Sequence, residues 1–245
     1  MTWAAIRIGV TTELASYLSG IVAATAFLLM ISTNHLFLLL GIIALHLFNL
    51  LDCVDGSIAR STHTENPYGK FLDSLIGDFF DFLFFTVVGI MAYRNTDLTY
   101  FFNNIHYLGN ISLLFLGWGA SLFYLFLQHI ENIYYMQLKE SWINLNKNNS
   151  SKTTTNILET DGHINNKSET DRNHILRLID RNIRARESQY FLLLVAYISD
   201  QIDLFLFFFL LYYAFRATAT AIVFGRRALA VKANHLSINS QKFGL

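Results

Sequence analysis

Five aspartates gather in one short stretch of the chain, DCVDGSIARSTHTENPYGKFLDSLIGDFFDF. Asp52 and Asp55 are spaced to share one face of a helix, and Asp73, Gly77 and Asp81 are spaced to share one face of the next. Ionised side chains at membrane depth are costly unless they face a cavity or a partner. Two acidic faces on neighbouring helices therefore need something positive between them.

The pattern favours a divalent metal site that works on phosphate. Mg²⁺ binds carboxylate oxygens and commonly shares them with substrate phosphates, and two such ions can clamp both sides of a phosphoryl transfer. Gly56 lets a ligand approach the helix backbone closely. Arg60, one turn further on, can pair with a phosphate. The alternative, solvated acids at helix ends, explains one or two aspartates better than the whole set.

The elements that must position these residues are apolar helices. Apolar residues make up 53% of the 245-residue chain and charged residues only 15%, whereas soluble domains carry about a quarter charged residues. A bilayer core needs about twenty apolar residues per helix. The fold class predicted is all-α integral membrane, a single domain with six spans at roughly 14–32, 35–58, 70–93, 106–129, 188–200 and 203–226. The formal net charge of zero gives no sign of a nucleic-acid partner.

The remaining segments are predicted to lie at the membrane surface or outside it. Trp3 and Arg7 favour an N-terminal interfacial helix. Residues 145–172 are polar and predict a mobile loop. Residues 174–189 predict a basic amphipathic helix on the inner leaflet. The fifth span is short, so a buried hairpin covering 188–226 is the alternative.

Lys and Arg set the predicted orientation. With six spans, nearly all of them fall on one side, in the loop before the third span, the segment 130–187 and the C-terminal tail. Cytoplasmic loops carry such an excess. Both termini and the aspartate-rich turn are therefore predicted to be cytoplasmic.

The aspartate-rich stretch resembles the signature of CDP-alcohol phosphotransferases, also called CDP-alcohol phosphatidyltransferases. That signature reads D-x-x-D-G-x-x-A-R, eight residues, G, then D-x-x-x-D. The residues that match it in identity and spacing are Asp52, Asp55, Gly56, Ala59, Arg60, Gly69 and Asp73. The motif covers only the second and third predicted helices, but a six-helix layout fits the rest of the chain.

The resemblance implies a membrane enzyme, usually a homodimer, with its active site in a cytoplasm-facing cavity. It implies transfer of a phospho-group from a CDP-linked donor to an alcohol acceptor, with release of CMP. Asp52, Asp55 and Asp73 would ligate two divalent ions, Mg²⁺ or Mn²⁺. The nucleotide site would be lined by Gly56, Ala59, Arg60 and Gly69.

The chain departs from the signature at its last aspartate, where it has Gly77. In the family this carboxylate ligates metal and is the expected general base toward the acceptor. Its loss removes a ligand of the second ion. Asp78 and Asp81 are the candidates to replace it. Asp78 can reach the site if the helix accommodates one extra residue as a π-bulge at Gly77, and such bulges often occur at functional sites. The bulge is the preferred interpretation.

Arg216 is a further candidate for binding substrate phosphate. It lies well inside the sixth predicted span, where an unpaired guanidinium is expensive. The alternative is a kinked helix that brings it to the interface. Arg186 and Glu187 either contribute to the cavity mouth or, as the preferred interpretation, anchor a helix at the interface.

Two polar residues and two glycines carry further predictions about contacts between helices. His46 and Asn49, on or near the Asp52 face, are acceptor contacts or, more commonly, a polar pair between helices. Gly117 and Gly119 are predicted to permit close contact between helices.

The sequence leaves the lipid partner open. The donor is either CDP-diacylglycerol with a small polar acceptor, or a small CDP-alcohol or CDP-linked phosphonate with a lipid or glycan acceptor. Two other functions compete with this one. A degenerate family member would bind nucleotide or lipid without turnover, and a scaffold or transporter would use the acids as an ion path.

Overall fold

The computed structural model describes residues 3, 7, 11–62, 66–99, 111–143, 178 and 180–243. Within these residues the secondary structure is helical, apart from one isolated β-bridge between Thr99 and Gln201. The all-α prediction is confirmed.

The described helices follow the predicted spans, with shifted ends. In order they are α2 (Thr12–Met30), α3 (His35–Thr62), α4 (Pro67–Arg94), η1 (Thr96–Leu98), α6 (Ile111–Ile133), the π-helix η2 (Tyr134–Leu138), α9 (Arg186–Ile198) and α10 (Ile202–Phe243). Five helical segments are long and apolar enough to cross a membrane: Thr12–Met30, His35–Thr62, Pro67–Arg94, Ile111–Ile143 and Ile202–Ala233. α9 has only 13 residues and is not among them, so the sixth span stays a prediction.

Capping residues explain where two of the helices begin. Thr11 precedes α2 in an extended conformation, and its side chain accepts a hydrogen bond from the Leu14 N–H. Asn66 caps α4 in the same way, and Pro67 follows at the start of the helix, where its missing N–H costs nothing. α4 therefore begins three residues before the apolar pattern predicted.

The chain divides into two compact units. The first contains residues 1–122 and 177–211, and the second contains residues 123–176 and 212–245. The aspartate-rich stretch belongs entirely to the first unit. In the second unit the rings of Tyr134 and Phe224 stack with centroids 3.9 Å apart, and Arg227 donates a hydrogen bond to the Tyr134 hydroxyl at 3.0 Å.

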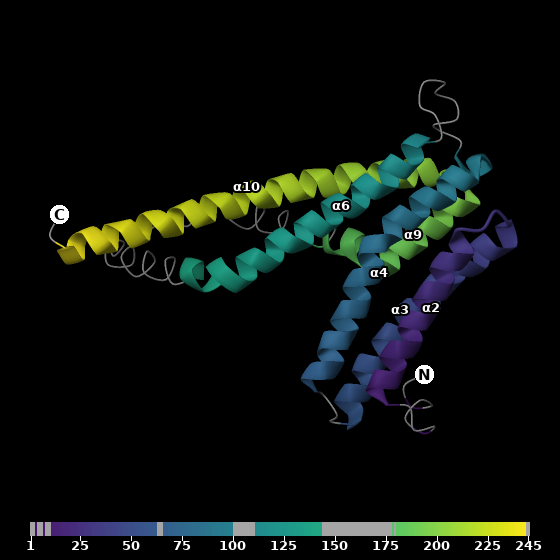
Figure 1. The fold of residues 1–245 in the computed structure, drawn as a ribbon, viewed down its shortest axis with the longest axis horizontal. Coiled ribbons are helices and arrows are strands. Elements are labelled where there is room, and N and C mark those ends of the chain that lie inside the picture. Colours follow the sequence, from purple (N-terminus) through teal and green to yellow (C-terminus); the bar gives the residue numbers. More distant parts are fainter. Residues whose placement is uncertain are drawn as a thin grey trace, which may run out of the picture. The chain divides into compact units, whose positions relative to one another are not determined.

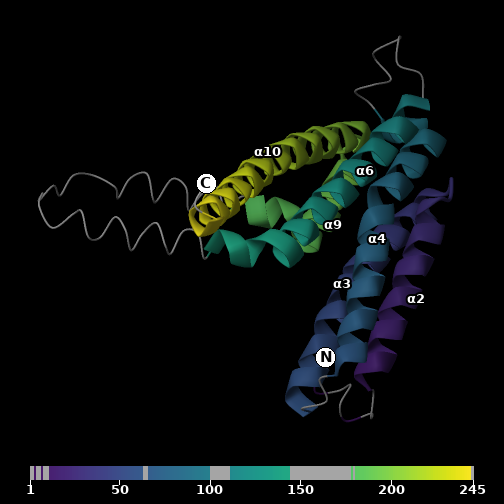
Figure 2. The same ribbon diagram turned by 60° about the vertical axis from the view of Figure 1, so that its left-hand side comes forward.

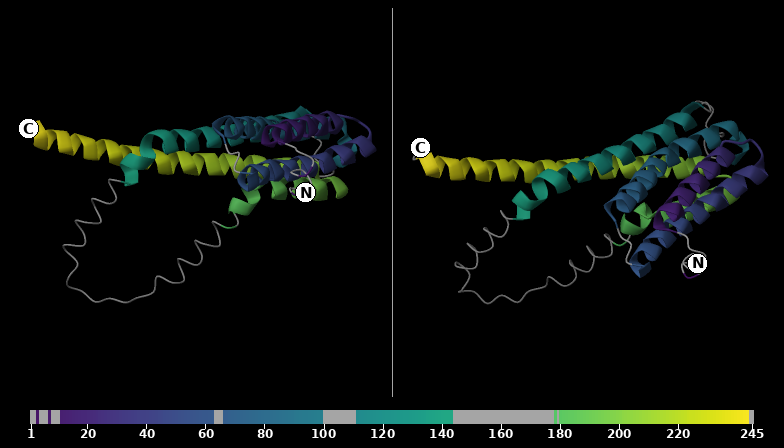
Figure 3. Two further views of the ribbon diagram at one scale, coloured as in Figure 1. Left: turned by 90° about the horizontal axis from the view of Figure 1, so that it is seen from below. Right: turned by 60° about the horizontal axis from the view of Figure 1, so that its bottom comes forward.

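In the first unit α2, α3 and α4 run side by side (Figures 1 and 2), with α9 packed against α3. The same three-helix arrangement is visible from below in Figure 3. Gly41 lets α3 approach α2, because a Cβ atom there would lie 2.9 Å from the Ala26 carbonyl oxygen. The Phe80 ring contacts Phe27 of α2 and Phe48 of α3 edge-on, at centroid distances of 5.4 and 5.8 Å. This aromatic contact packs the three helices against one another.

The start of α6 packs closely on α4. A Cβ atom at Gly117 would lie 2.4 Å from the Phe85 carbonyl oxygen and 2.8 Å from the Gly89 Cα atom. Beside this contact the Thr86 hydroxyl donates to the Ser121 hydroxyl oxygen at 2.9 Å. The predicted role of Gly117 in close helix packing is therefore confirmed.

Several predicted segments lie outside the described residues. These are most of the N-terminal interfacial helix, the loop at 145–172, and all but the end of the amphipathic helix at 174–189. Trp3 and Arg7 are described, and both are exposed. The Arg7 guanidinium lies 5.0 Å from the centre of the Trp3 ring.

Candidate active site

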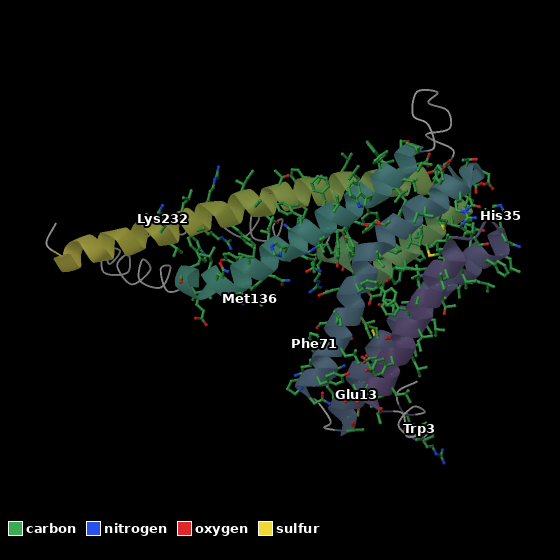
Figure 4. The ribbon with its side chains drawn as sticks, viewed as in Figure 1. Trp3, Glu13, His35, Phe71, Met136 and Lys232 are labelled. Atoms are coloured by element: carbon green, nitrogen blue, oxygen red, sulfur yellow. The ribbon has the colours of Figure 1, made fainter. Side chains whose placement is uncertain are left out.

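The matched signature residues converge on one cavity of about 310 Å³ at one end of the α2–α3–α4 bundle. In Figure 4, Glu13 and Phe71 mark this end and His35 marks the opposite end. The cavity is lined by Thr12, Ser16, Asp55, Gly56, Ala59, Arg60, Asn66, Gly69, Lys70 and Asp73. Every matched signature residue except Asp52 is in this lining. Its volume lies at the lower end of the ~300–1,000 Å³ of typical small-molecule sites.

Asp55 is the buried acid of the cavity, with 3% of the residue exposed. The Ser16 hydroxyl of α2 donates to Asp55 Oδ2 at 2.6 Å, and the Gly56 N–H donates to Asp55 Oδ1 at 2.5 Å. Charge-assisted hydrogen bonds of this kind are the strong ones. They fix the Asp55 carboxylate in one orientation.

The other wall of the cavity is the N-terminus of α4. The Asn66 side chain accepts from the Gly69 N–H at 2.6 Å, which fixes the first turn. A helix N-terminus favours anions through its dipole and its N–H groups. Lys70 in that turn and Arg60 at the end of α3 add positive charge beside it. The cavity thus combines a carboxylate side with a side suited to phosphate.

Asp52 and Asp73 bring further carboxylates to the same place. Asp73 lies close enough to Asp52 and Asp55 for the three carboxylates to interact electrostatically. Carboxylates this close repel each other unless a cation or a shared proton lies between them. The structure therefore brings together the three predicted metal ligands from two helices.

Arg186, the first residue of α9, supplies a cation to this group. Its Nη1 atom lies 2.8 Å from Asp52 Oδ2, and its Nε atom lies 2.9 Å from Asp81 Oδ1. Burial lowers the pKa of the Arg186 guanidinium, but the charges of Asp81 and Asp52 outweigh burial and raise its pKa above the ordinary value. Arg186 therefore stays charged and joins α9 to both α3 and α4. It reaches into the site, whereas an interface anchor was the preferred interpretation.

The predicted π-bulge at Gly77 is wrong, because α4 is an uninterrupted α-helix from Pro67 to Arg94. Among the described residues, a π-helix lies instead at Tyr134–Leu138. An α-helix turns about 100° per residue, so Asp78 points about 140° away from Asp73. Asp78 is exposed, while Asp81 lies partly buried against Arg186. Of these two acids, Asp81 is therefore the one that lies beside the aspartate group, through its pairing with Arg186.

A hard cation is chemically suited to these oxygen ligands, but the described side chains do not form a complete set of metal ligands. Within the described part of the chain, no three His, Cys, Asp or Glu side chains are arranged to hold a metal ion. Two carboxylates line the cavity, those of Asp55 and Asp73, and Asp52 interacts with Asp73. An ion held here would therefore need further ligands from a substrate phosphate or from water. Between Asp52 and Asp81, the positive charge is supplied by the Arg186 guanidinium, which pairs with both.

Two other predicted residues are not in the lining of the cavity. Arg216 belongs to the second unit, so its predicted phosphate contact stays a prediction. His46 packs edge-on against Tyr190 with ring centroids 6.1 Å apart, and its Nε2 atom is buried without a hydrogen-bond partner. At His46 an aromatic contact thus occupies the place where a polar contact between helices was expected.

A comparison with known protein families agrees with this geometry. Residues 11–130 match the family model named CDP-alcohol phosphatidyltransferase. The resemblance seen in the signature is therefore confirmed over these residues. The family transfers a phosphate-linked group from a CDP-alcohol. No curated protein matches the chain.

Sequence reasoning missed the polar residues around the signature. Thr12, Ser16, Asn66 and Lys70 line the cavity, although none belongs to the signature. Asn66 carries a readable signal, because an asparagine directly before a proline is typical of a helix start. Ser16 carries none, since a serine in an apolar helix usually bonds its own backbone.

Proposed function

We propose that this protein is a membrane phosphotransferase that moves a substituted phosphate from a CDP-linked donor to an alcohol and releases CMP. The observation that carries the proposal is the single cavity shared by Asp55, Gly56, Ala59, Arg60, Gly69 and Asp73. A signature of purely structural origin would not need to collect around one opening. The match of residues 11–130 to the family model supports the same reaction class.

The cavity offers separate places for the parts of the donor. The diphosphate would lie against Arg60, Lys70 and the N-terminus of α4, which are the cationic elements of the lining. Gly56 and Gly69 let the donor approach the backbone of two helices. The carboxylates of Asp55 and Asp73 would face the phosphate that is transferred.

In the proposed reaction the acceptor oxygen attacks the phosphorus that carries the donor alcohol. A new P–O bond forms to the acceptor, and the bond from that phosphorus to the bridging oxygen of the diphosphate breaks. CMP leaves with the bonding electrons, and the acceptor proton passes to a carboxylate or to water. A divalent ion, when bound, would stabilise the charge that develops on the phosphate oxygens.

We further propose that the ion is Mg²⁺ or Mn²⁺ held by Asp52, Asp55 and Asp73. The positive-inside distribution of Lys and Arg supports a cytoplasmic site and cytoplasmic termini. The resemblance supports a homodimer and a role in phospholipid or head-group synthesis. The donor is either CDP-diacylglycerol with a small polar acceptor, or a small CDP-linked alcohol or phosphonate with a lipid or glycan acceptor.

A CMP-release screen tests the proposal. Purified protein in detergent is incubated with Mg²⁺, a panel of CDP-linked donors and a panel of alcohols, and CMP is quantified. CMP that forms only when both donor and acceptor are present supports transfer. Stabilisation by CDP compounds without CMP release would favour the non-catalytic alternative. Neither effect with any donor would favour the ion-path alternative.

A further inference from the structure

Arg186 occupies the space that a side chain at position 77 would need. A Cβ atom added to Gly77 would lie 2.5 Å from Arg186 Nη2, closer than real Cβ contacts. Position 77 is where the family signature has its last carboxylate. In this chain a guanidinium fills the place of that acid, so the sign of the charge there is reversed.

The guanidinium is held on several sides at once. Nη1 donates to Asp52 Oδ2 at 2.8 Å, and Nε lies 2.9 Å from Asp81 Oδ1 and 3.0 Å from Asp81 Oδ2. The Phe48 ring lies 5.6 Å from the guanidinium carbon. Only 26% of the Arg186 side chain is exposed. A side chain with this many contacts is a fixed part of the site.

These contacts determine how many carboxylate oxygens are left for metal. Arg186 engages one oxygen of Asp52 and both oxygens of Asp81. The carboxylates that line the cavity are those of Asp55 and Asp73, and Asp52 interacts with Asp73. This number of available carboxylates suits one hard cation, because such an ion takes only one or two carboxylates when it also binds phosphate and water.

We propose that Arg186 is a fixed cation that takes the place of a second metal ion, so that each chain binds one divalent cation. The inference rests on the proposed function and assigns it a metal stoichiometry. Arg186 is a positioning residue here. It pairs with Asp52 and Asp81 and neutralises their charge where no metal is bound.

The number of Mn²⁺ ions bound per chain tests this role of Arg186 directly, because an arginine with a merely structural role would not change that number. Bound Mn²⁺ is counted by electron paramagnetic resonance on the detergent-solubilised full chain, with CDP present. We expect one bound Mn²⁺ per wild-type chain. We expect one as well in Arg186→Lys, which keeps the charge, and in Arg184→Gln, a matched control whose arginine pairs with Asp180 at 3.2 Å.

The double variant Gly77→Asp/Arg186→Gln tests the replacement. It removes the guanidinium, frees oxygens of Asp52 and Asp81, and puts a carboxylate into the space that Nη2 leaves. We expect two bound Mn²⁺ per chain. A monodisperse elution profile shows that the variant is folded, and if it is not, the wild-type count alone decides.

The failures of the two proposals are distinguishable. Two Mn²⁺ per wild-type chain would overturn the role of Arg186 while leaving the transfer reaction intact. Wild-type protein that releases CMP but binds no Mn²⁺ would also overturn the proposed role of Arg186, together with the metal requirement. One Mn²⁺ without CMP release from any donor supports the role of Arg186 and overturns the reaction.

Discussion

Ser16 of α2 donates a 2.6 Å hydrogen bond to Asp55 of α3, 39 residues further along the chain. Both residues are buried, with 1% and 3% of their surface exposed. α2 carries no residue of the signature, yet this bond makes it part of the site. The acid that points into the cavity is oriented by a neighbouring helix as well as by its own.

Ser16→Ala removes this donor from a buried carboxylate. We expect the free energy of unfolding to fall by about 1–3 kcal/mol, the usual cost of leaving a buried acceptor unsatisfied. Turnover should fall as well, because Asp55 loses its orientation. Thermal unfolding and CMP release measure the two effects. Ser57→Ala is the control, since the Ser57 hydroxyl bonds only its own helix, at the Cys53 carbonyl, and it should behave like the wild type.

Replacing each predicted metal ligand by its amide tests the acidic group. Asp52→Asn, Asp55→Asn and Asp73→Asn should each reduce turnover by about a hundredfold or more, the scale seen when one charge-stabilising group is lost. Folding should persist, since each change also relieves repulsion between carboxylates. CMP release and elution profiles are the readouts. Full activity in any one of the three would remove that residue from the reaction.

The geometry of α4 predicts different effects on turnover for substitutions at Asp78 and at Asp81. Asp78 is exposed on an unbulged helix, so Asp78→Asn should leave turnover near the wild-type value. Asp81→Asn weakens the ion pair that holds Arg186 and should reduce turnover by about tenfold or more, within the range of catalytic hydrogen-bond losses. If the order is reversed, with Asp78→Asn the more damaging change, α4 bulges at Gly77 in the working enzyme.

Gly117→Ala tests the close contact between α4 and α6. The added Cβ atom would meet the Phe85 backbone at 2.4 Å, and overpacking of this kind typically costs about 1–3 kcal/mol of stability. Gly225→Ala is the matched control, because its Cβ atom would meet nothing within 4 Å. That change should be neutral or stabilising. Thermal unfolding in detergent compares them, and equal melting temperatures would contradict the contact.

Single-cysteine labelling tests the orientation. Cys53 is replaced by serine, and cysteine is introduced at Ser150 or at Thr96. A membrane-impermeant thiol reagent applied outside should label Thr96→Cys and spare Ser150→Cys, because nearly all Lys and Arg fall on the Ser150 side. Labelling of Ser150→Cys from outside would reverse the orientation and move the site to the other face.

Much of the fold and part of the site could be predicted from patterns among residues that are close in sequence. Apolar runs predicted the helices, and the spacing of the aspartates predicted an acidic face on each of two neighbouring helices, because both signals depend on neighbours in sequence. The contacts of Ser16 and Arg186 were not predictable, since their partners lie 39 and 105–134 residues away. The bulge was inferred from one displaced acid, but the space at Gly77 is filled by an arginine from another helix.

The most direct test of the central claim is product analysis of a reaction containing purified wild-type protein, Mg²⁺, a CDP-linked donor and an alcohol. CMP and the phosphodiester of donor alcohol and acceptor are quantified together by mass spectrometry, with Asp73→Asn as the inactive control. The account predicts that both products form in equal amounts, only when donor and acceptor are both present, and not in the control. Persistent absence of CMP with folded wild-type protein across lipid and non-lipid donors, or equal CMP formation by Asp73→Asn, would contradict it.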